Sequence, residues 1–447
     1  MEDPFLRPPT PDPPTSPVVY DSDASLSNAR TRTPTGGTGR SVTHIRRCAV
    51  TSGSGSLTVS VVMPCLNEAD TVAACVRSAR EALAAAGLVG EVIVADNGST
   101  DGSLELARAA GARVITVAAR GYGNALMAGI EAAHGRYVVM GDADQSYDFA
   151  ETPRFAAKLD EGYDLVQGCR LPSGGGVVRP GAMPLLHRWI GNPVFTLLAR
   201  WWFRVPIHDV FCGLRGFAKE SYQRLHLQCT GMEFATEMVV RASLLHLRMG
   251  EVPVTLHPDG RRTHASHLRT FRDGWRTLRF YLLFSPRWLF LLPGLGLIVL
   301  GVAAAVAGYA GLRISGVGLD VHTLLFGALM IIAGYQGVIF AILTKAFAIN
   351  ARLLPDDPRL EHFVRVVSLE RGLIAGATLG VAGLVLLVAT IAEWAGTEFG
   401  SLDYPHTMRI AIPGVLSTVL GLQTILFVFF ASVLQLDRRP SHPAADV

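Results

Sequence analysis

Two aspartates with one residue between them, Asp142 and Asp144, are the residues whose type and spacing most clearly suggest chemistry. They end a hydrophobic stretch, 136–142, that has the pattern of a buried strand. In extended backbone, residues two apart point to the same side, so both carboxylates would face one site. Two such oxygen ligands suit a divalent cation that keeps positions open for substrate phosphates. A solvated turn is the alternative, and the buried strand favours the metal.

Three more polar segments follow hydrophobic stretches. PCLNE contains Pro64, Asn67 and Glu68, and DNGSTDG begins at Asp96. An acid at the end of a strand can accept a hydrogen bond from a nucleotide base or ribose, but either segment alone could be only a turn or a helix cap. The glycine-rich RGYGNALMAG, which contains Gly121, opens a helix whose free N–H groups attract an anion. It lacks the GxGxxG and P-loop spacings, which makes those two nucleotide motifs weak candidates.

Strand-like and helix-like patterns alternate from residue 57 onward. The predicted strands are 57–63, 91–96, 113–117, 136–142 and 164–168. The predicted helices are 68–86, 101–110, 122–134 and about 151–160. This alternation implies parallel βαβ units, in which ligands bind at the carboxyl ends of the strands. We therefore expect an α/β, Rossmann-like domain with a mostly parallel sheet and with the polar segments at one edge of it.

A hydrophobic part follows this domain. Four stretches contain no Asp, Glu, Lys or Arg: 288–312, 322–344, 372–392 and 410–436. Each exceeds the roughly 20 residues that cross the hydrocarbon core of a bilayer. The chain is only 17% charged, against roughly 25% in soluble proteins. Buried helices of a soluble domain are the alternative, but four such stretches favour an all-α transmembrane domain.

Basic residues predict the orientation of the four spans. The loop 345–371 carries Lys345, Arg352, Arg359, Arg365 and Arg371. The loops 313–321 and 393–409 carry one arginine each. Because basic loops stay in the cytosol, we expect a multi-pass cell-membrane protein with its catalytic domain and both termini cytosolic.

The expected parts of the chain are a disordered cytosolic tail (1–56), a soluble domain (57–260), a basic amphipathic juxtamembrane segment (261–287), a transmembrane domain (288–436) and a second cytosolic tail (437–447). The first tail is rich in Pro, Ser, Thr and Gly and buries too little apolar surface to fold. Two stretches, 183–205 and 268–284, mix aromatic and basic residues and suit either the membrane interface or the surface of the soluble domain.

Net charge and cysteine spacing give no indication of a nucleic-acid partner or of a disulfide framework. The net charge of +3 is too small to indicate a nucleic-acid partner. The six cysteines are scattered without CxxC spacing, so we expect reduced thiols and no disulfide framework.

The ordered set PCLNE, DNGSTDG, RGYGNA and DAD resembles glycosyltransferase family 2, with its GT-A fold, over residues 57–260. Three later segments are similar to the polyprenol-phosphate glycosyltransferases, the group of dolichol-phosphate mannose and glucose synthases. They are GCRLPSGGG (168–176), DVFCGLRGF (209–217) and GRRTHASHLRTFRDGW (260–275).

The resemblance implies a role for each candidate residue. The expected donor-binding residues are Pro64, Asn67, Glu68, Asp96, Gly121 and Asp142. Asp142 and Asp144 are the expected ligands of Mg²⁺ or Mn²⁺, with Ser146 where relatives have a third ligand. The expected acceptor-phosphate residues are Arg170, His187 and Arg188. The expected catalytic residues are Asp144, Arg170, Asp209 and Arg215.

The implied reaction transfers a hexose from GDP-mannose or UDP-glucose to dolichyl or undecaprenyl phosphate at the cytosolic membrane face, with inversion and with a metal. A lipid phosphate is already largely ionised at neutral pH and needs positioning more than a general base. The cost lies in the leaving diphosphate, whose charge a metal and arginines stabilise.

Two alternatives come from other classes. A processive polysaccharide synthase usually has a TED-like base and a QxxRW motif, and neither occurs here. A non-catalytic transport or assembly protein usually places ionisable groups at mid-membrane, whereas the spans hold only Gln336 and Gln423 as amides. Two spans would be enough to anchor the domain. Formation of a homo-oligomer is one explanation for the presence of four spans.

Overall fold

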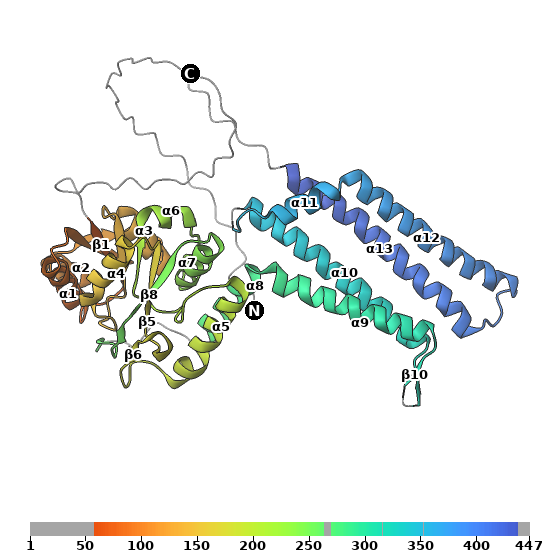
Figure 1. Cartoon of the computed structure of the whole chain (residues 1–447), viewed down its shortest axis with the longest axis horizontal. Helices are drawn as coiled ribbons and strands as arrows, with labels where there is room; N and C mark the ends of the chain where they lie inside the picture. Colours follow the sequence, from red (N-terminus) through yellow and green to blue (C-terminus); the bar gives the residue numbers. More distant parts are fainter. Residues whose placement is uncertain (1–57, 263–269, 315, 352, 437–447) are drawn as a thin grey trace, which may run out of the picture. The chain divides into compact units, whose positions relative to one another are not determined.

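The computed structural model describes residues 58–262, 270–314, 316–351 and 353–436. The predicted tails 1–56 and 437–447 lie outside these ranges. An α/β domain is followed by a set of long apolar helices (Figure 1), so the expected fold class is confirmed.

The α/β domain is built around one seven-stranded sheet. Its strands are β1 (Val59–Cys65), β2 (Gly90–Asp96), β3 (Arg113–Thr116), β4 (Tyr137–Met140), β5 (Leu165–Cys169), β7 (Arg215–Ala218) and β8 (Met249–Pro253). Their order is β3-β2-β1-β4-β7-β5-β8. β7 runs antiparallel to β4 and β5, and the other neighbouring pairs are parallel. The prediction of a mostly parallel sheet is therefore confirmed.

Helices cover both faces of this sheet. They are α1 (Val72–Ala85), α2 (Ser103–Ala109), α3 (Tyr122–Ala132), α4 (Thr152–Asp160), α6 (Lys219–Leu225) and α7 (Glu233–Leu244). Along β1, Val61 packs in one core with Val76 of α1, whereas Val62 packs in a second core with Leu126 of α3. Alternate residues of a strand point to opposite faces. A sheet buried on both faces explains why its strands are continuous apolar runs in the sequence.

Shorter elements complete this domain. They are the 3₁₀ turns η1 (Phe149–Glu151) and η2 (Pro172–Gly174), the π-helical turn η3 (His187–Gly191), and the paired strands β6 (Val177–Val178) and β9 (Thr255–Leu256).

The two stretches with mixed aromatic and basic residues form α5 (Asn192–Phe203) and α8 (Thr270–Leu283). On α5, Ala199 is buried whereas Trp201 is 62% exposed. On α8, Tyr281 is buried whereas Phe271 is 85% exposed. Each helix thus has an apolar face that the described residues leave uncovered, as an interfacial helix requires. The membrane-interface position itself stays a prediction.

Four helices are long and apolar enough to cross a membrane: Arg287–Tyr309, Val321–Asn350, Leu369–Gly396 and Tyr404–Leu434. They comprise the π-helical turn η4 (Arg287–Leu291) with α9 (Leu292–Tyr309), α10 (Val321–Asn350), α12 (Leu369–Gly396) and α13 (Tyr404–Leu436). A hairpin of β10 (Arg313–Ile314) and β11 (Val317–Gly318) and a helix, α11 (Pro358–Val366), lie between them. The predicted number of long apolar helices, four, is confirmed among the described residues.

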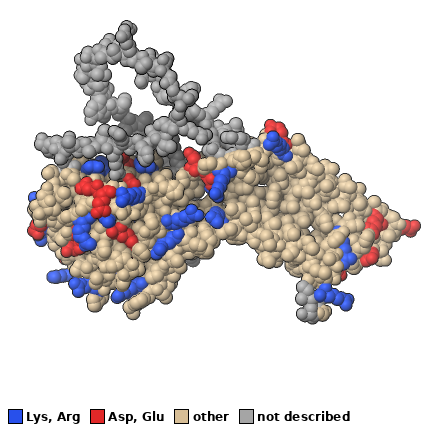
Figure 2. All heavy atoms as spheres, in the orientation of Figure 1, with Lys and Arg blue, Asp and Glu red and all other residues tan. Residues whose placement is uncertain are grey.

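Three of the four helices extend beyond the predicted spans, whereas α9 ends at Tyr309, before the predicted end at 312. The predicted span 322–344 stops before Lys345, but α10 continues to Asn350. The predicted spans end at the first charged residue. A helix can continue past a lysine or arginine, because a long basic side chain can extend along the helix surface to the membrane interface. In Figure 2, charged side chains lie at the two ends of the helical part, and its middle shows none on the visible face.

Glycines allow two of the helix pairs to approach closely. A Cβ on Gly301 of α9 would lie 2.7 Å from the carbonyl oxygen of Gly327 in α10. A Cβ on Gly421 of α13 would lie 2.6 Å from the carbonyl oxygen of Gly376 in α12. Close backbone contact through small residues is a common way for membrane helices to associate.

Candidate active site

The two aspartates of the DAD segment lie in a loop after β4. The strand ends at Met140, so the predicted strand 136–142 is too long by two residues at this end. Gln145 has a left-handed φ of 63°, and Asp144 Oδ1 accepts hydrogen bonds from the Ser146 backbone N–H (2.9 Å) and hydroxyl (2.5 Å). A tight turn, rather than the alternation of a strand, therefore orients Asp144.

Asp142 is fixed by two neighbours. The hydroxyl of Tyr122, the first residue of α3, donates to Asp142 Oδ1 at 2.9 Å. A Cβ on Gly213 would lie 2.6 Å from Asp142 Oδ2, so only glycine leaves room there. Burial and the charge of Asp144 raise the pKa of Asp142 to about 6. The two carboxylates thus share one site, in which their repulsion favours a bound cation.

Arg261 provides a positive charge beside this carboxylate pair. Its guanidinium pairs with Glu68 at 2.5 Å and with Asp259 at 2.6 Å. Its Nη1 also lies 3.4 Å from Asp144 Oδ2. The Arg261 side chain is only 11% exposed, so its contacts with Glu68 and Asp144 are largely shielded from solvent. The PCLNE loop is thereby joined to the DAD loop by a residue far along the chain.

The first two predicted donor loops contact each other. They leave neighbouring parallel strands, in which Pro64 pairs with Ala95 and Cys65 with Asp96. Asn67 Oδ1 accepts from the Thr100 backbone N–H at 2.9 Å. Both oxygens of the buried Asp96 accept backbone N–H groups within its own loop, with Gly98 and Ser99 as donors at 3.1 Å.

Asn97 connects the third loop to the second. Its Oδ1 accepts from the Gly121 backbone N–H at 2.6 Å, and its Nδ2 donates to the Ala119 carbonyl oxygen at 2.8 Å. Gly121 has a φ of 141°, and a Cβ there would lie 2.4 Å from the Thr230 carbonyl oxygen. This close approach explains the glycine. The structure thus brings together the predicted donor residues and the two aspartates.

Two predicted catalytic residues, Arg170 and Asp209, form a buried ion pair. Arg170 Nε lies 2.8 Å from Asp209 Oδ2, and Nη2 lies 2.9 Å from Oδ1. The Arg170 backbone N–H also donates to Oδ2 at 3.0 Å. Arg170 Nη1 lies 3.4 Å from the hydroxyl of Tyr147, which accepts from the Gly213 backbone N–H at 2.8 Å. The pair is therefore connected to the glycine that borders Asp142, and the acceptor-phosphate contact of Arg170 stays a prediction.

Arg215 is a buried charge below the same loop. It pairs with Met140 across β7 and β4 and is 0% exposed. Its guanidinium donates to the carbonyl oxygens of Ala235 (2.6 Å) and Cys212 (2.8 Å). Burial lowers the pKa of Arg215. The guanidinium is thus held by backbone carbonyl groups, and the catalytic role of Arg215 stays a prediction.

His187 and Arg188 begin the turn that leads into α5. The Arg188 guanidinium lies 5.5 Å from the centre of the Trp189 ring. Among the described residues, no ion pair joins Arg188 to Asp142 or Asp144. The acceptor-phosphate role of this pair is not tested by the structure.

The structure adds four residues to the predicted set: Tyr122, Tyr147, Gly213 and Arg261. Tyr122, Gly213 and Arg261 lie inside the sequence motifs, so the sequence identified the segments that contain them. Their contacts could not, because each joins residues that are distant in sequence.

The carboxylates of the site provide only part of a coordination shell for Mg²⁺ or Mn²⁺. Among the described residues, no group of three or more His, Cys, Asp or Glu could hold a metal. Mg²⁺ is usually held by one or two carboxylates, with water and substrate phosphates as the other ligands. Asp142 and Asp144 fit that arrangement, in which the substrate completes the site.

Comparisons with known proteins identify the family of the chain. Residues 60–225 match the model of glycosyl transferase family 2, and residues 342–435 match that of the glycosyltransferase family 2 C-terminal transmembrane region. The low-salt glycan biosynthesis hexosyltransferase of Haloferax volcanii is 36% identical over 84% of this chain and 89% of its own. The dolichyl-phosphate hexose transferase of the same organism is 32% identical over 41% of this chain and 76% of its own.

Two further likenesses cover about half of the chain. The undecaprenyl-phosphate 4-deoxy-4-formamido-L-arabinose transferase of Salmonella paratyphi B is 30% identical over 44% of this chain and 58% of its own. A crystal structure of Mycobacterium tuberculosis glucosyl-3-phosphoglycerate synthase with Mn²⁺, uridine diphosphate and glucosyl-3-phosphoglycerate is similar with a TM-score of 0.38. It is 22% identical and covers 51% of this chain and 77% of that one.

Proposed function

Since the chain belongs to glycosyltransferase family 2, we propose that this membrane glycosyltransferase transfers a hexose from a nucleotide sugar to a polyprenyl phosphate. The observation that carries the proposal is the carboxylate pair Asp142 and Asp144, with Arg261 beside it, at the edge of the sheet where the donor loops meet. The names of two relatives, a dolichyl-phosphate and an undecaprenyl-phosphate transferase, support the class of acceptor.

The donor side of the reaction needs charge stabilisation. Bound at Asp142 and Asp144, Mg²⁺ or Mn²⁺ would neutralise charge on the nucleoside diphosphate that leaves. Tyr122 holds Asp142 in place, and Arg261 offers a guanidinium next to Asp144. Fixed positive groups of this kind stabilise developing negative charge because they need no reorganisation during the reaction.

The acceptor side needs positioning. A new bond forms between a phosphate oxygen of the lipid and the anomeric carbon of the hexose. The bond between that carbon and the nucleoside diphosphate oxygen breaks, and the diphosphate keeps the electron pair. No proton must be removed from an ionised phosphate. Attack from the side opposite the leaving group inverts the configuration at the anomeric carbon. We propose that His187, Arg188 and Arg170 bind the phosphate of the lipid.

The proposed location follows from the basic loop between the second and third helices. Lys345, Arg359 and Arg371 lie in or beside that loop, and basic loops remain in the cytosol. The loop follows α10, and the catalytic domain precedes α9, so two spans place both on the same side. We propose that this side is the cytosolic one.

A transfer assay tests the proposed donors. The purified protein in detergent would receive polyprenyl phosphate, Mg²⁺ or Mn²⁺, and radiolabelled UDP-glucose or GDP-mannose separately. We expect metal-dependent label in the lipid phase from one of them. Binding of both donors without transfer to the lipid would contradict the acceptor and favour the polysaccharide synthase.

Removing one hydroxyl tests the positioning of Asp142. In the Tyr122→Phe variant, Asp142 loses the hydrogen bond that orients it. Loss of such a partner typically costs about 10- to 100-fold in metal affinity or activity. We expect the metal concentration for half-maximal transfer to rise within that range. Tyr163→Phe is the control, because that ring packs against Gly250 of β8 and, among the described residues, makes no hydrogen bond with Asp142 or Asp144. An unchanged metal dependence in Tyr122→Phe would contradict the assignment.

Arg261→Gln tests the charge beside the DAD loop. The variant loses its ion pairs with Glu68 and Asp144. We expect KM for the nucleotide sugar to rise by about tenfold, since charge-assisted contacts to phosphate are among the stronger ones. Arg262→Gln is the matched control, because Arg262 is exposed and its backbone, not its side chain, bonds to Asp70. Equal effects of the two variants would show that only net charge matters.

A further inference from the structure

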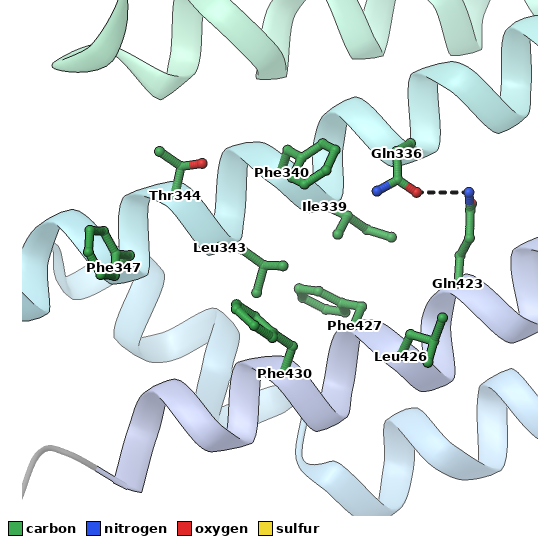
Figure 3. A pocket seen from close by; sticks show the side chains of 10 residues that line it. All are labelled: Gln336, Ile339, Phe340, Leu343, Thr344, Phe347, Gln423, Leu426, Phe427 and Phe430. Carbon is green, nitrogen blue, oxygen red and sulfur yellow. Dashed lines mark hydrogen bonds between the residues drawn. The ribbon is translucent and has the colours of Figure 1, made fainter. Parts of the chain in front are cut away.

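A groove runs along two of the membrane-spanning helices. It lies between α10 and α13, has a volume of about 540 Å³ and is lined by 10 side chains (Figure 3). Ile339 and Leu343 of α10 point toward Phe427 and Phe430 of α13, and Phe340 and Phe347 also line the groove. Ligand pockets of proteins usually measure about 300–1,000 Å³ and are mostly apolar. The volume of the groove is therefore sufficient for part of a chain-like apolar ligand.

The two ends of the groove differ. At one end, Gln423 Nε2 donates to Gln336 Oε1 at 2.9 Å, and this pair bridges the two helices. At the other end, Phe347 lies close to the end of α10 at Asn350, within the basic segment 345–371. The residues from Gln336 to Phe347 extend over about 16 Å of helix, which is roughly half of a 30 Å hydrocarbon core. The groove thus occupies one leaflet, on the side of the basic loop.

The open walls of this groove are aromatic. Phe347 is 57% exposed and Phe430 is 54% exposed. Phe427, by contrast, is buried and forms the floor. Because the groove is concave, an apolar chain that lies in it would contact the protein on more than one side.

The groove is connected to the segment that joins the catalytic domain to the membrane. Phe290 lies in the π-helical turn that opens the first span, and its ring centre is 5.9 Å from that of Phe340. Trp288, two residues earlier, stacks on Trp202 of α5 at 5.7 Å. Phe340 thus contacts Phe290, and Trp288 of the same turn contacts α5 of the catalytic domain. This wall of the groove would lie in the leaflet where a lipid phosphate is attacked.

We propose that this groove binds the apolar chain of the polyprenyl phosphate acceptor. The inference rests on the proposed function and adds a second binding site for the same substrate. The phosphate would lie at the catalytic domain, the first isoprene units would lie between it and the groove, and the following units would lie between α10 and α13, below the Gln336–Gln423 pair. Binding energy from this remote part of the substrate would help to hold the phosphate in position.

Two groove-filling variants test this proposal, Leu426→Trp and Thr344→Trp. The exposed Val385 of α12 lies outside the groove, so Val385→Trp is the matched control. Each protein would be assayed with a long polyprenyl phosphate and with a phosphate of two isoprene units, which is too short to occupy the groove.

We expect both groove variants to lower kcat/KM for the long acceptor by about tenfold. Their rates with the short acceptor, which also report correct folding, should match those of the unaltered protein, and Val385→Trp should change neither value. Equal losses with both acceptors, or no loss with the long one, would overturn the inference while the proposed function stands. An unaltered protein that transfers to neither acceptor would overturn the proposed function, and the inference with it.

Discussion

Replacing Asp144 with alanine should lower the rate of hexosyl transfer by about a thousandfold, an effect comparable to the loss of a main electrostatic group in other enzymes. The variant loses one of the two proposed metal ligands. It also leaves Arg261, whose Nη1 lies 3.4 Å from Asp144 Oδ2, with one negative partner fewer. The measurement is the turnover rate at saturating donor, acceptor and metal.

Two further variants separate charge from shape. Asp144→Asn keeps an oxygen that can accept from Ser146 but loses the negative charge, so we expect nearly the same loss of rate. Glu105→Gln removes a charge from the surface of α2, where Glu105 lies 4.0 Å from Arg108 and 74% of its side chain is exposed. That control should retain full activity. An Asp144→Ala protein with more than a tenth of the original rate would exclude Asp144 as a catalytic residue.

Replacing Asp209 with alanine should have the largest effect on stability. Asp209 is fully buried, and its loss leaves the Arg170 guanidinium buried without its carboxylate. Breaking a buried ion pair on one side typically costs about 3–5 kcal/mol. For a domain of this size we expect the unfolding temperature of the catalytic domain to fall by roughly 10 °C. The unfolding temperature is measured in detergent, with proteolysis of the catalytic domain as the readout of its unfolding.

A double variant shows whether the ion pair itself is the cause. When both partners of a buried pair are replaced by apolar residues of similar volume, stability is often unchanged. The protein with Arg170→Met and Asp209→Leu should therefore unfold close to the original temperature, although its activity should be lost. If the double variant is as unstable as Asp209→Ala, packing around Asp209 rather than charge accounts for the loss.

The sequence predicted the elements of the α/β domain because their hydrophobic patterns are local. β2 was expected at 91–96 and spans Gly90–Asp96, and α3 was expected at 122–134 and spans Tyr122–Ala132. The largest difference is the first helix, expected from residue 68 but beginning at Val72. The Glu68 backbone N–H donates to Ser103 Oγ at 2.8 Å, so a contact with the first residue of α2 holds this part of the chain outside the helix.

The candidate site was predicted less completely. Motifs identified the loops, since each lies after a strand of the parallel sheet and therefore at the same edge. They did not reveal that Arg170 and Asp209 form one ion pair, or that Arg261 contacts Glu68. These contacts join residues that are far apart in the chain, and their distances depend on the folded backbone. The turn around Gln145 likewise replaced the strand geometry expected for Asp142 and Asp144.

The identity of the labelled product is the most direct test of the central claim. The protein would be incubated with metal, the active nucleotide sugar and one of three acceptors: polyprenyl phosphate, the corresponding polyprenol, or an oligosaccharide. Mass spectrometry of the lipid phase would then identify the product. We predict a single hexose joined to polyprenyl phosphate, formed with that acceptor alone and absent after chelation of the metal. A labelled polymer, or equal transfer to the polyprenol, would contradict the account.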